Sequence, residues 1–379
     1  MPDADIGAWT DRQRPPRRQV CAAPVPPSVA AAVHQATRSI GGIDRERVDA
    51  WLAEHVAHAV PPFSYRLIAG GRSNLTYQVA DAGGRRFVLR RPPLGNVLDS
   101  AHDVGREHRI ISALQSTRVP VATALAVCDD PAVNGAPFYV MAFVDGAVLR
   151  SESDAERSFD EAGRAAAGRS LVDVLAELHG LDPDAVGLGT LGRREGYAER
   201  TLRRWYAQFQ SSKERDIPAI DEAHRLLAAN VPEQHRTSIV HGDYRIDNCI
   251  LGPDGSMRAV LDWELCTLGD PLADLGLLMV YWVEAGEDAS EVLTGSATAA
   301  SGFPGRAAIV ERYAARSGAD VSDLDFFVAL GYWKLACVFE GIRARYGAGV
   351  MGDDFSVEDS ARHVVSLAET ALRLCEGLR

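Results

Sequence analysis

The spacing of apolar residues changes near residue 145, and this change constrains the fold more than any other feature of the sequence. Before it, short runs rich in β-branched and aromatic residues are separated by Gly70-Gly71 and Gly83-Gly84, which is typical of antiparallel hairpins. The five runs lie at residues 63–68, 75–79, 85–90, 124–127 and 138–144. After Asp145-Gly146, apolar residues recur at steps of three and four, as they do in amphipathic helices. The sequence therefore predicts an α+β fold with strands first and helices second.

The predicted elements divide the chain into three parts. Two helices are expected in the strand-rich part, one after Asp44 and one at residues 103–114. The later helical pattern covers residues 160–179, 197–210, 217–230, 272–285, 306–317, 324–346 and 357–374. Residues 1–40 are rich in proline and arginine and have no sustained period, which indicates a mobile arm. We expect this arm, a small lobe over residues 41–144 with a five-stranded antiparallel sheet and a helix, and a large, mostly helical lobe over residues 145–379.

Charge and composition exclude several classes of protein. The net charge of −12 argues against binding to nucleic acid or to an anionic membrane surface, because both need clustered Lys and Arg. The longest apolar run, residues 275–283, is shorter than the ~20 residues that cross a bilayer, and the N-terminal segment lacks the apolar stretch of a secretion signal. The six cysteines occur singly, so neither a zinc site nor a disulfide framework is indicated. We expect a cytoplasmic protein.

One polar stretch, residues 238–263, interrupts the helical pattern with two short β-like pieces around the turn Pro253-Asp254-Gly255-Ser256. If this turn is centred between Asp254 and Gly255, Asn248 lies opposite Leu261 and therefore beside Asp262. An amide oxygen and a carboxylate at the mouth of a hairpin suit Mg²⁺. Asp243, on the loop that enters this mouth, could orient a hydroxyl group and take its proton.

These residues resemble a known superfamily. His241-Gly242-Asp243 with Asn248, and Leu261-Asp262-Trp263-Glu264, are similar to motifs of the aminoglycoside phosphotransferase and choline kinase superfamily, which is protein-kinase-like. Further segments that resemble it lie at residues 71–77, 87–93, 106–110, 137–141 and 269–274. The combination is most similar to the branch found fused to, or encoded beside, acyl-CoA dehydrogenases, and it extends over roughly residues 44–375.

The resemblance implies roles for particular residues. Asp243 corresponds to the catalytic base, and Asn248 and Asp262 correspond to ligands of Mg²⁺. Asp274 resembles the carboxylate that braces the loop containing the base, whereas Asp270, which precedes Pro271, is expected to cap a helix. Two further acidic residues, Asp247 and Glu264, either assist the site or belong to its polar rim.

The strand-rich part supplies candidates for binding ATP. A glycine-rich loop between two predicted strands, with Gly70, Gly71, Ser73 and Asn74, would cover the nucleotide phosphates, although a glycine pair in a hairpin can also be a simple turn. Alternation along the third strand puts Val88 and Arg90 on one face. No lysine precedes Lys213, so Arg90 must take the place of the usual strand lysine as the phosphate cation.

Other residues would complete the nucleotide site. Glu107 would pair with Arg90, unless it is an exposed helical residue. Met141 and Phe143, at the end of the fifth strand, would lie near the adenine, unless they only fill the core. The helices expected to contact the acceptor contain Trp205, Tyr206, Trp333 and Arg343.

The sequence thus predicts an ATP- and Mg²⁺-dependent phosphotransferase, a kinase that transfers the γ-phosphoryl group to a hydroxyl group of a small molecule. The dehydrogenase-associated branch indicates a hydroxy acid or a hydroxyacyl thioester as the acceptor, and the broader family indicates an aminoglycoside. Two alternatives remain: a nucleotide-binding pseudokinase with a regulatory or docking role, which the absent lysine favours, and a metal-dependent hydrolase that uses the same carboxylates on water.

Overall fold

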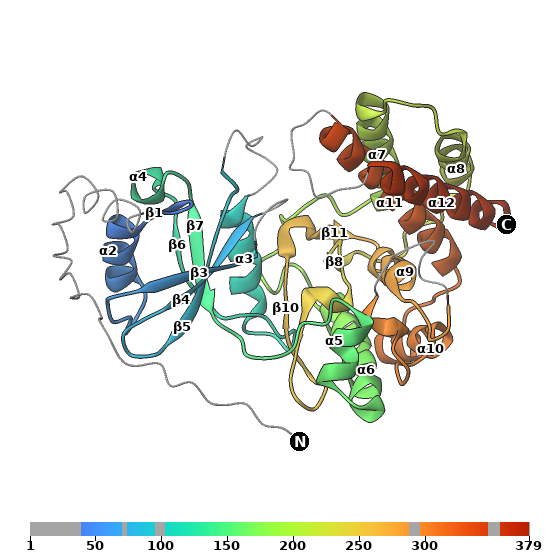
Figure 1. Ribbon diagram of the computed structural model, residues 1–379. Coiled ribbons are helices and arrows are strands. Elements are labelled where there is room, and N and C mark those ends of the chain that lie inside the picture. Colours follow the sequence, from blue (N-terminus) through green and yellow to red (C-terminus); the bar gives the residue numbers. More distant parts are fainter. Residues whose placement is uncertain (1–38, 70–73, 95–102, 288–295, 348–356, 379) are drawn as a thin grey trace, which may run out of the picture.

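The computed structural model describes residues 39–69, 74–94, 103–287, 296–347 and 357–378. Within them, a small lobe built on one sheet precedes a larger lobe made mostly of helices (Figure 1). The predicted arm lies almost entirely outside the described residues.

The small lobe contains the predicted five-stranded antiparallel sheet, in the order β3-β4-β5-β7-β6. Its strands are β3 (Ser64–Ala69), β4 (Leu75–Ala80), β5 (Arg86–Arg91), β6 (Ala124–Cys128) and β7 (Phe138–Ala142). Helix α2 (Arg45–His55) begins where Asp44 accepts a hydrogen bond from the Arg47 N–H, as predicted. A short hairpin of β1 (Ser39–Ile40) and β2 (Ile43–Asp44) precedes it, and α4 (Pro131–Asn134) lies where only a turn is predicted.

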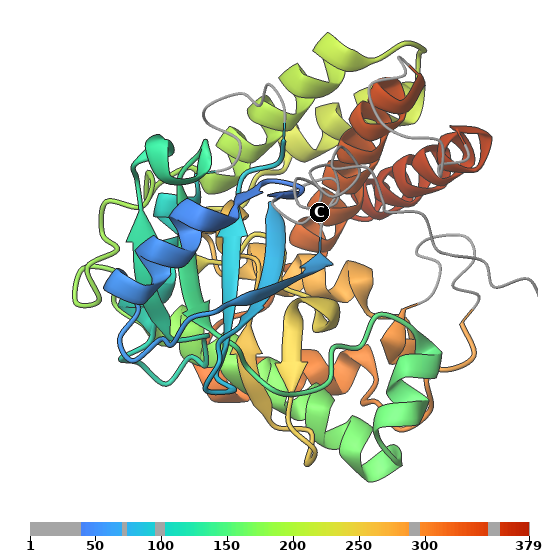
Figure 2. The ribbon, with the colours of Figure 1, turned by 60° about the vertical axis from the view of Figure 1, so that its left-hand side comes forward.

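Alternation along the strands explains how two helices cover the two faces of this sheet. Phe87 and Leu89 of β5 share one buried cluster with Val48 and Leu52 of α2, whereas Val88 belongs to the cluster that contains α3 (Val104–Leu114). Figure 2 shows α2 lying across one face. Since Arg90 is two residues from Val88, it also lies on the face that carries α3, as the sequence predicts.

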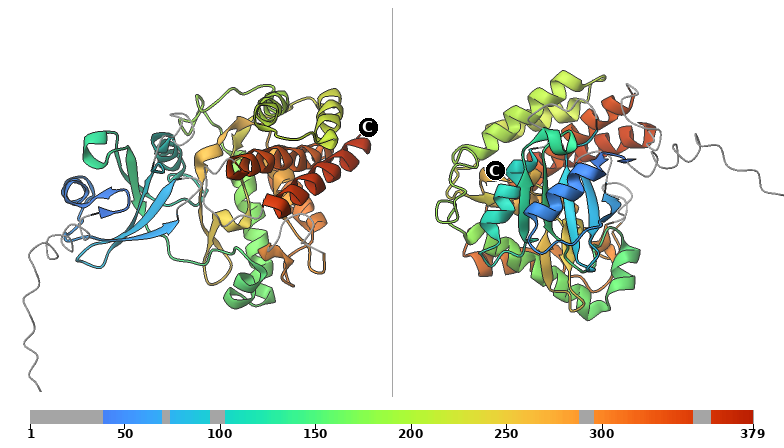
Figure 3. Two further views of the ribbon diagram at one scale, coloured as in Figure 1. Left: turned by 45° about the horizontal axis from the view of Figure 1, so that its top comes forward. Right: turned by 90° about the vertical axis from the view of Figure 1, so that its left-hand side faces the viewer.

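The large lobe is helical, and its helices largely follow the predicted ranges. They are α5 (Glu152–Ser158), α6 (Glu161–Gly180), α7 (Tyr197–Ser212), α8 (Pro218–Ala229), α9 (Leu272–Tyr281), α10 (Arg306–Ser317), α11 (Leu324–Gly347) and α12 (Val357–Glu376). Helix α5 is not predicted, and α9 ends four residues before the predicted end. In Figure 3, α11 and α12 lie side by side on the side of this lobe away from the sheet.

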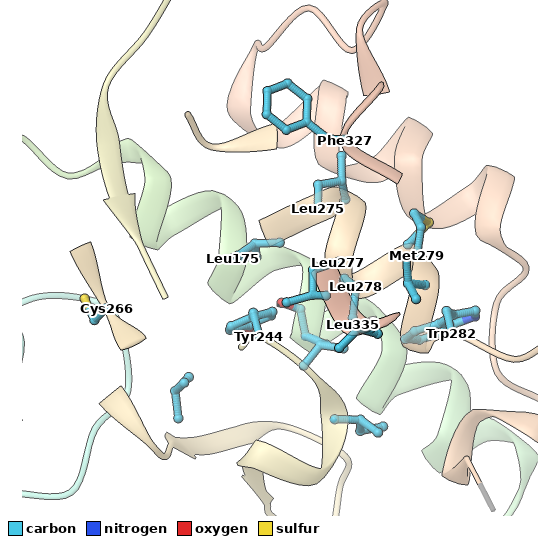
Figure 4. Packing of buried hydrophobic residues seen from close by; sticks show 14 of the residues in the cluster. Leu175, Tyr244, Cys266, Leu275, Leu277, Leu278, Met279, Trp282, Phe327 and Leu335 are labelled. Carbon is cyan, nitrogen blue, oxygen red and sulfur yellow. Dashed lines mark hydrogen bonds between the residues drawn. The ribbon is translucent and has the colours of Figure 1, made fainter. Parts of the chain in front are cut away.

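Helix α9 is the centre of the large-lobe core. Eight of its ten residues are buried, so it is apolar on every side rather than along one stripe. Figure 4 shows its leucines among side chains from other elements, including Phe327 of α11 and Tyr244. Tyr244 is fully buried, and its hydroxyl donates to the Leu171 carbonyl of α6 at 2.8 Å. Because Tyr244 follows Asp243 directly, the core fixes the chain at the predicted site.

Two small antiparallel pairs lie between the sheet and the helices. Strands β9 (Cys249–Leu251) and β10 (Met257–Val260) form the predicted hairpin, and β8 (Ser238–Val240) pairs with β11 (Thr267–Gly269). Short 3-10 turns η1 (Ile246–Asn248) and η2 (Trp263–Leu265) flank the hairpin, and η3 (Ala297–Ala299) follows α9.

Two further features of the described residues are their lack of a membrane-spanning helix and the state of their cysteines. Among them, no helix is both long and apolar enough to cross a membrane. The five cysteines that lie within the described ranges are free and buried, as expected for structural thiols.

Candidate active site

The loop of residues 241–248 holds the two polar side chains predicted to act together. The Asn248 side-chain amide donates two hydrogen bonds to Asp243, one to its Oδ2 and one to its backbone carbonyl, each at 2.9 Å. The amide nitrogen therefore holds the Asp243 carboxylate, and the amide oxygen of Asn248 remains as a potential cation ligand.

The hairpin brings Asp262 to the same place, in the predicted alignment. Val260 pairs with Cys249, and the Leu261 N–H donates to the Asn248 carbonyl at 2.8 Å. Asp262, the next residue, has a φ of 64°, in the left-handed region that residues other than glycine rarely adopt. Backbone strain of this kind persists where the surrounding structure imposes it, and it often marks a functional site.

His241 ties the 241–248 loop to the hairpin. Its ring is fully buried, its Nε2 donates to the Leu261 carbonyl at 2.9 Å, and its Nδ1 accepts from the Asp243 N–H at 3.2 Å. These bonds fix the distance between the two carboxylate-bearing segments, and they make His241 a structural member of the site.

Asp274 of α9 braces the loop, as the resemblance implies. Its two carboxylate oxygens accept from the backbone N–H groups of His241, at 2.6 Å, and Gly242, at 2.8 Å. His179 Nε2 lies 3.2 Å from the same carboxylate, and its Nδ1 lies 2.7 Å from the Tyr313 hydroxyl. Burial opposes ionisation of Asp274, but the hydrogen bond and charge of His179 outweigh it, so the pKa of Asp274 is lowered. The brace is therefore an ionised carboxylate.

Lys334 of α11 completes this support, and the sequence reasoning missed it. Its Nζ donates to the Gly242 carbonyl at 3.0 Å. Burial lowers the pKa of the Lys334 ammonium, while the Asp243 and Asp274 carboxylates oppose that shift. Gly242 itself has a φ of 85°, and a Cβ there would lie 2.7 Å from the Leu265 carbonyl oxygen. The signal for Lys334 was its rarity: the chain has one other lysine, Lys213, and Lys334 is the one charged residue in the stretch 326–339 of α11.

On the opposite side of the site, the predicted pair of Arg90 and Glu107 is formed. Arg90 Nε lies 2.9 Å from Glu107 Oε2, and Arg90 Nη2 lies 2.5 Å from Asp262 Oδ1. Glu107 is 2% exposed, so it is not the surface residue of the alternative interpretation. One guanidinium thus joins α3, β5 and the hairpin residue Asp262.

Glu107 has two further partners. The Tyr139 hydroxyl donates to it at 2.9 Å and the Asn74 amide at 3.0 Å. Burial raises the pKa of Glu107, and the Arg90 charge opposes this. Asn74, predicted in the phosphate loop, has its side chain turned to Glu107, while Gly70, Gly71 and Ser73 lie outside the described residues.

The residues expected near an adenine lie on the sheet face that carries Arg90. Val88 of β5 pairs with Met141 of β7, and both are buried in the same cluster as the large-lobe core. Phe143 is partly exposed, and the Arg86 guanidinium lies 4.4 Å from its ring centre. The three side chains form an apolar wall next to the Arg90 pair.

A cluster of carboxylates faces Arg90. Single oxygens of Glu107, Asp262 and Glu264 lie within 4.8 Å of one another. Burial, followed by the charges of Asp262 and Glu107, raises the pKa of Glu264 to about 7. The charge of Asp243, the predicted base, contributes to the same rise in the pKa of Glu264. Carboxylate oxygens gathered in this way suit a hard divalent cation such as Mg²⁺, and the cluster includes Glu264, whose role the sequence left open.

Most of the aromatic and basic residues suggested for the acceptor lie elsewhere. Trp333 is fully buried and donates to the Ile220 carbonyl, and Arg343 pairs with Glu340 and Glu214. Tyr206 donates to Asp221 and stacks on His224. Trp205 alone lies near the loop support, with its ring centre 5.9 Å from Lys334 Nζ.

Comparison with known proteins gives consistent results. The phosphotransferase enzyme family matches residues 64–315. Acyl-CoA dehydrogenase family member 11 of Gallus gallus is 35% identical over 83% of this chain, and the chain spans only 41% of that relative. A Ralstonia eutropha structure that carries the provisional name aminoglycoside phosphotransferase has a TM-score of 0.75 and 32% identity, over 88% of this chain and 98% of its own.

A more distant structure shows the fold alone. The aminoglycoside phosphotransferase APH(4)-Ia, solved with ADP and hygromycin B, has a TM-score of 0.58 and 13% identity, over 86% of this chain and 97% of its own. The two-lobed, protein-kinase-like architecture is therefore common to all of these structures and this one.

Proposed function

Because the chain belongs to the phosphotransferase enzyme family, we propose that it is an ATP- and Mg²⁺-dependent kinase that phosphorylates a hydroxyl group of a small molecule. The observation that supports this most is the convergence of three segments: the 241–248 loop with Asp243 and Asn248, the hairpin with Asp262, and the Arg90–Glu107 pair.

Each group has a role that follows from its chemistry. Asp243, oriented by Asn248, holds the acceptor hydroxyl and accepts its proton. Asn248 and Asp262 hold Mg²⁺, which neutralises charge on the β and γ phosphates when bound. Arg90, aimed by Glu107, contacts the nucleotide phosphates with a guanidinium fork. The backbone at Gly70, Gly71, Ser73 and Asn74 would cover those phosphates, while the Asn74 side chain donates to Glu107. Val88, Met141 and Phe143 would lie against the adenine.

The support for a nucleotide also comes from structural neighbours. APH(4)-Ia was solved with ADP and hygromycin B, and its fold is the fold of this chain.

The class of acceptor is suggested by the names of relatives and structural neighbours. Dehydrogenase-linked relatives favour a hydroxy acid or hydroxyacyl thioester, whereas the neighbours with antibiotic acceptors favour an aminoglycoside.

The test uses two variants with different expected effects. Asp243→Ala removes proton transfer, so kcat for any accepted alcohol falls by ~10²–10⁴ while Mg·ATP still binds. Asp262→Ala instead weakens binding of Mg·ATP, which calorimetry measures. Asp216→Ala, at an exposed surface carboxylate, is the matched control and leaves both unchanged.

Three outcomes would contradict the proposal. Unchanged phosphorylation in both variants would remove the assigned base and metal ligand. Mg·ATP binding without transfer to any alcohol, in the unaltered chain, would favour the pseudokinase, and phosphate release that no alcohol accelerates would favour the hydrolase.

A further inference from the structure

The buried carboxylate of Glu107 is surrounded by hydrogen-bond donors. Its Oε2 lies 2.9 Å from Arg90 Nε and accepts from the Tyr139 hydroxyl at 2.9 Å. Its Oε1 accepts from the Asn74 amide at 3.0 Å and from Arg90 Nη2 at 3.3 Å. Since a carboxylate offers about four acceptor positions on its two oxygens, these donors fix the orientation of the Glu107 side chain.

The strands of the small-lobe sheet determine where these donors lie. Arg90 of β5 pairs directly with Tyr139 of β7, so the two side chains share one face of the sheet. Thr76 of β4 pairs with Arg90 from the other side, and Asn74, two residues before Thr76, reaches Glu107 on the same face. Three neighbouring strands thus direct a phenol, a guanidinium and an amide at one carboxylate of α3.

The ion pair of Arg90 and Glu107 would not by itself fix where the guanidinium lies. Both side chains have several rotatable bonds, so a bond between their ends sets their separation rather than their place in the lobe. Tyr139 and Asn74 are each 3% exposed, and the packing around them holds them in place. Their hydrogen bonds therefore tie Glu107 to the sheet, and Glu107 in turn fixes Arg90.

Packing alone does not explain these two polar side chains. A phenylalanine would fill the space of the Tyr139 ring, and the Tyr139 hydroxyl donates to Glu107. The Oδ1 of Asn74 is buried without a hydrogen-bond partner in the part of the chain that the structure describes, whereas its Nδ2 donates to Glu107. Because an unpaired buried polar atom costs free energy, an amide at this position is explained by the carboxylate that it holds.

We propose that Tyr139 and Asn74 are positioning residues, whose side chains act through Glu107 to hold Arg90 at the nucleotide phosphates. The inference rests on the proposed function, in that it requires a nucleotide whose phosphates contact Arg90. The other carboxylate partner of Arg90 is Asp262, which is the proposed ligand of Mg²⁺. Support from Glu107 is therefore the support that remains available to Arg90 when Asp262 holds the metal.

The experiment separates the phosphates of the nucleotide from its base. Calorimetry on the full chain measures the binding of adenosine, and of the non-hydrolysable ATP analogue AMP-PNP with Mg²⁺. Tyr139→Phe should weaken binding of AMP-PNP by about tenfold, the low end of the range for a lost hydrogen bond to a charged group, and leave binding of adenosine unchanged. KM for ATP should rise by a similar factor, with kcat for any accepted alcohol nearly unchanged.

A second variant and a control exclude a general loss of structure. Asn74→Ala removes the other donor and should weaken binding of AMP-PNP by about threefold, which tests the inference even if Tyr139→Phe does not fold. Tyr65→Phe is the matched control, because the Tyr65 hydroxyl donates to the Asp49 carboxylate at 2.6 Å and its ring packs against the buried cluster on the opposite face of the same sheet. It should bind AMP-PNP as the unaltered chain does.

A double-mutant cycle tests the route through Glu107. In a Glu107→Gln background, the Tyr139 hydroxyl no longer holds a carboxylate that aims Arg90. Tyr139→Phe should then cause a much smaller further loss of AMP-PNP binding than it causes in the unaltered chain, because the two residues act as a unit. Equal losses in the two backgrounds would show that Tyr139 acts by another route.

Three other results would also overturn the inference: unchanged binding of AMP-PNP in both Tyr139→Phe and Asn74→Ala, an equal loss of binding for adenosine, and an equal loss in Tyr65→Phe. Normal phosphate transfer by the unaltered chain would leave the kinase intact in each case. The kinase fails separately if AMP-PNP binds but no alcohol is phosphorylated, and the variants then still decide the positioning roles. No binding of AMP-PNP by the unaltered chain contradicts both.

Discussion

At the scale of single residues, the replacement of a strand lysine by Arg90 has a geometric consequence. A guanidinium presents several N–H donors in a fixed plane, so it can contact two carboxylates at once. Arg90 does so, with Glu107 from the small lobe and Asp262 from the hairpin. Since both partners are acidic and Glu107 is buried, the arginine compensates charge that would otherwise be costly to bury.

The prediction at the scale of single residues concerns Lys334. Lys334→Met should remove the hydrogen bond to the Gly242 carbonyl and loosen the loop that holds Asp243. Displacement of a reacting group by about 1 Å can cost about 100-fold in rate, so we expect kcat to fall by about 10- to 100-fold with KM for ATP unchanged. Steady-state kinetics check this.

The other lysine provides the control for this prediction. Lys213→Met changes a residue that pairs with Asp216 at the end of α7, away from the loop, and should leave kcat unchanged. An equal loss of kcat in both variants would show that the effect is not specific to the loop.

What could be predicted at this scale depended on distance along the chain. Asp243, Asn248 and Asp262 lie within 20 residues of one another, and one turn determines how they meet. The contact of Lys334 with Gly242 spans 92 residues, and the contact of Arg90 with Asp262 spans 172. Such contacts depend on how whole elements are arranged, and no local pattern specifies that arrangement.

At the scale of elements, two carboxylates at the start of α9 hold different parts of the structure. Asp270 Oδ1 accepts a hydrogen bond from the Leu272 N–H at 2.9 Å, as expected of a helix cap, whereas Asp274 binds two N–H groups of the 241–248 loop. The two carboxylates lie four residues apart and support different structures.

The corresponding prediction compares two substitutions. Asp270→Ala should lower the free energy of unfolding by about 1 kcal/mol and leave kcat nearly unchanged, as for loss of a capping bond. Asp274→Asn should lower kcat strongly, because an amide cannot accept from both backbone N–H groups and a buried donor loses its partner. Denaturant unfolding and kinetics on the same preparations measure both. A larger loss of kcat in Asp270→Ala than in Asp274→Asn would contradict the assignment.

Element prediction succeeded where periodicity was distinctive. The alternation in β4 and β5 and the turn before β10 were sufficient to predict these strands. Helix α9 was predicted too long because its apolar run continues through Trp282 and Val283, which are buried but no longer helical. Trp282 instead donates from Nε1 to the Pro304 carbonyl, a tertiary contact that periodicity does not reveal.

At the scale of the whole molecule, Arg106 of α3 connects the small lobe to the hairpin region. Its guanidinium donates to the carbonyls of Glu264, at 3.3 Å, and Cys266. Arg106 precedes Glu107, so this contact also fixes the part of α3 that aims Arg90. In the sequence, Arg106 is distinguished only as part of residues 106–110, which resemble the superfamily.

The whole-molecule prediction follows from this connection. Arg106→Met should raise KM for ATP several-fold, because Glu107 and Arg90 lose their fixed position relative to Asp262, while the isolated lobes keep their cores. Arg109→Met is the matched control on the same helix, since Arg109 contacts Gly187 and Thr190 rather than the hairpin. Kinetics at varied ATP check this, and a KM unaffected by Arg106→Met would show that the lobes are positioned by other contacts.

Helix α9 has one more consequence. The segment that fills the centre of the large lobe also presents the carboxylate that holds the 241–248 loop. Any substitution that repacks this segment, whether selected for heat resistance or acquired by drift, also shifts that carboxylate. The evolution of thermal stability and the evolution of turnover are therefore coupled through the ten residues of α9.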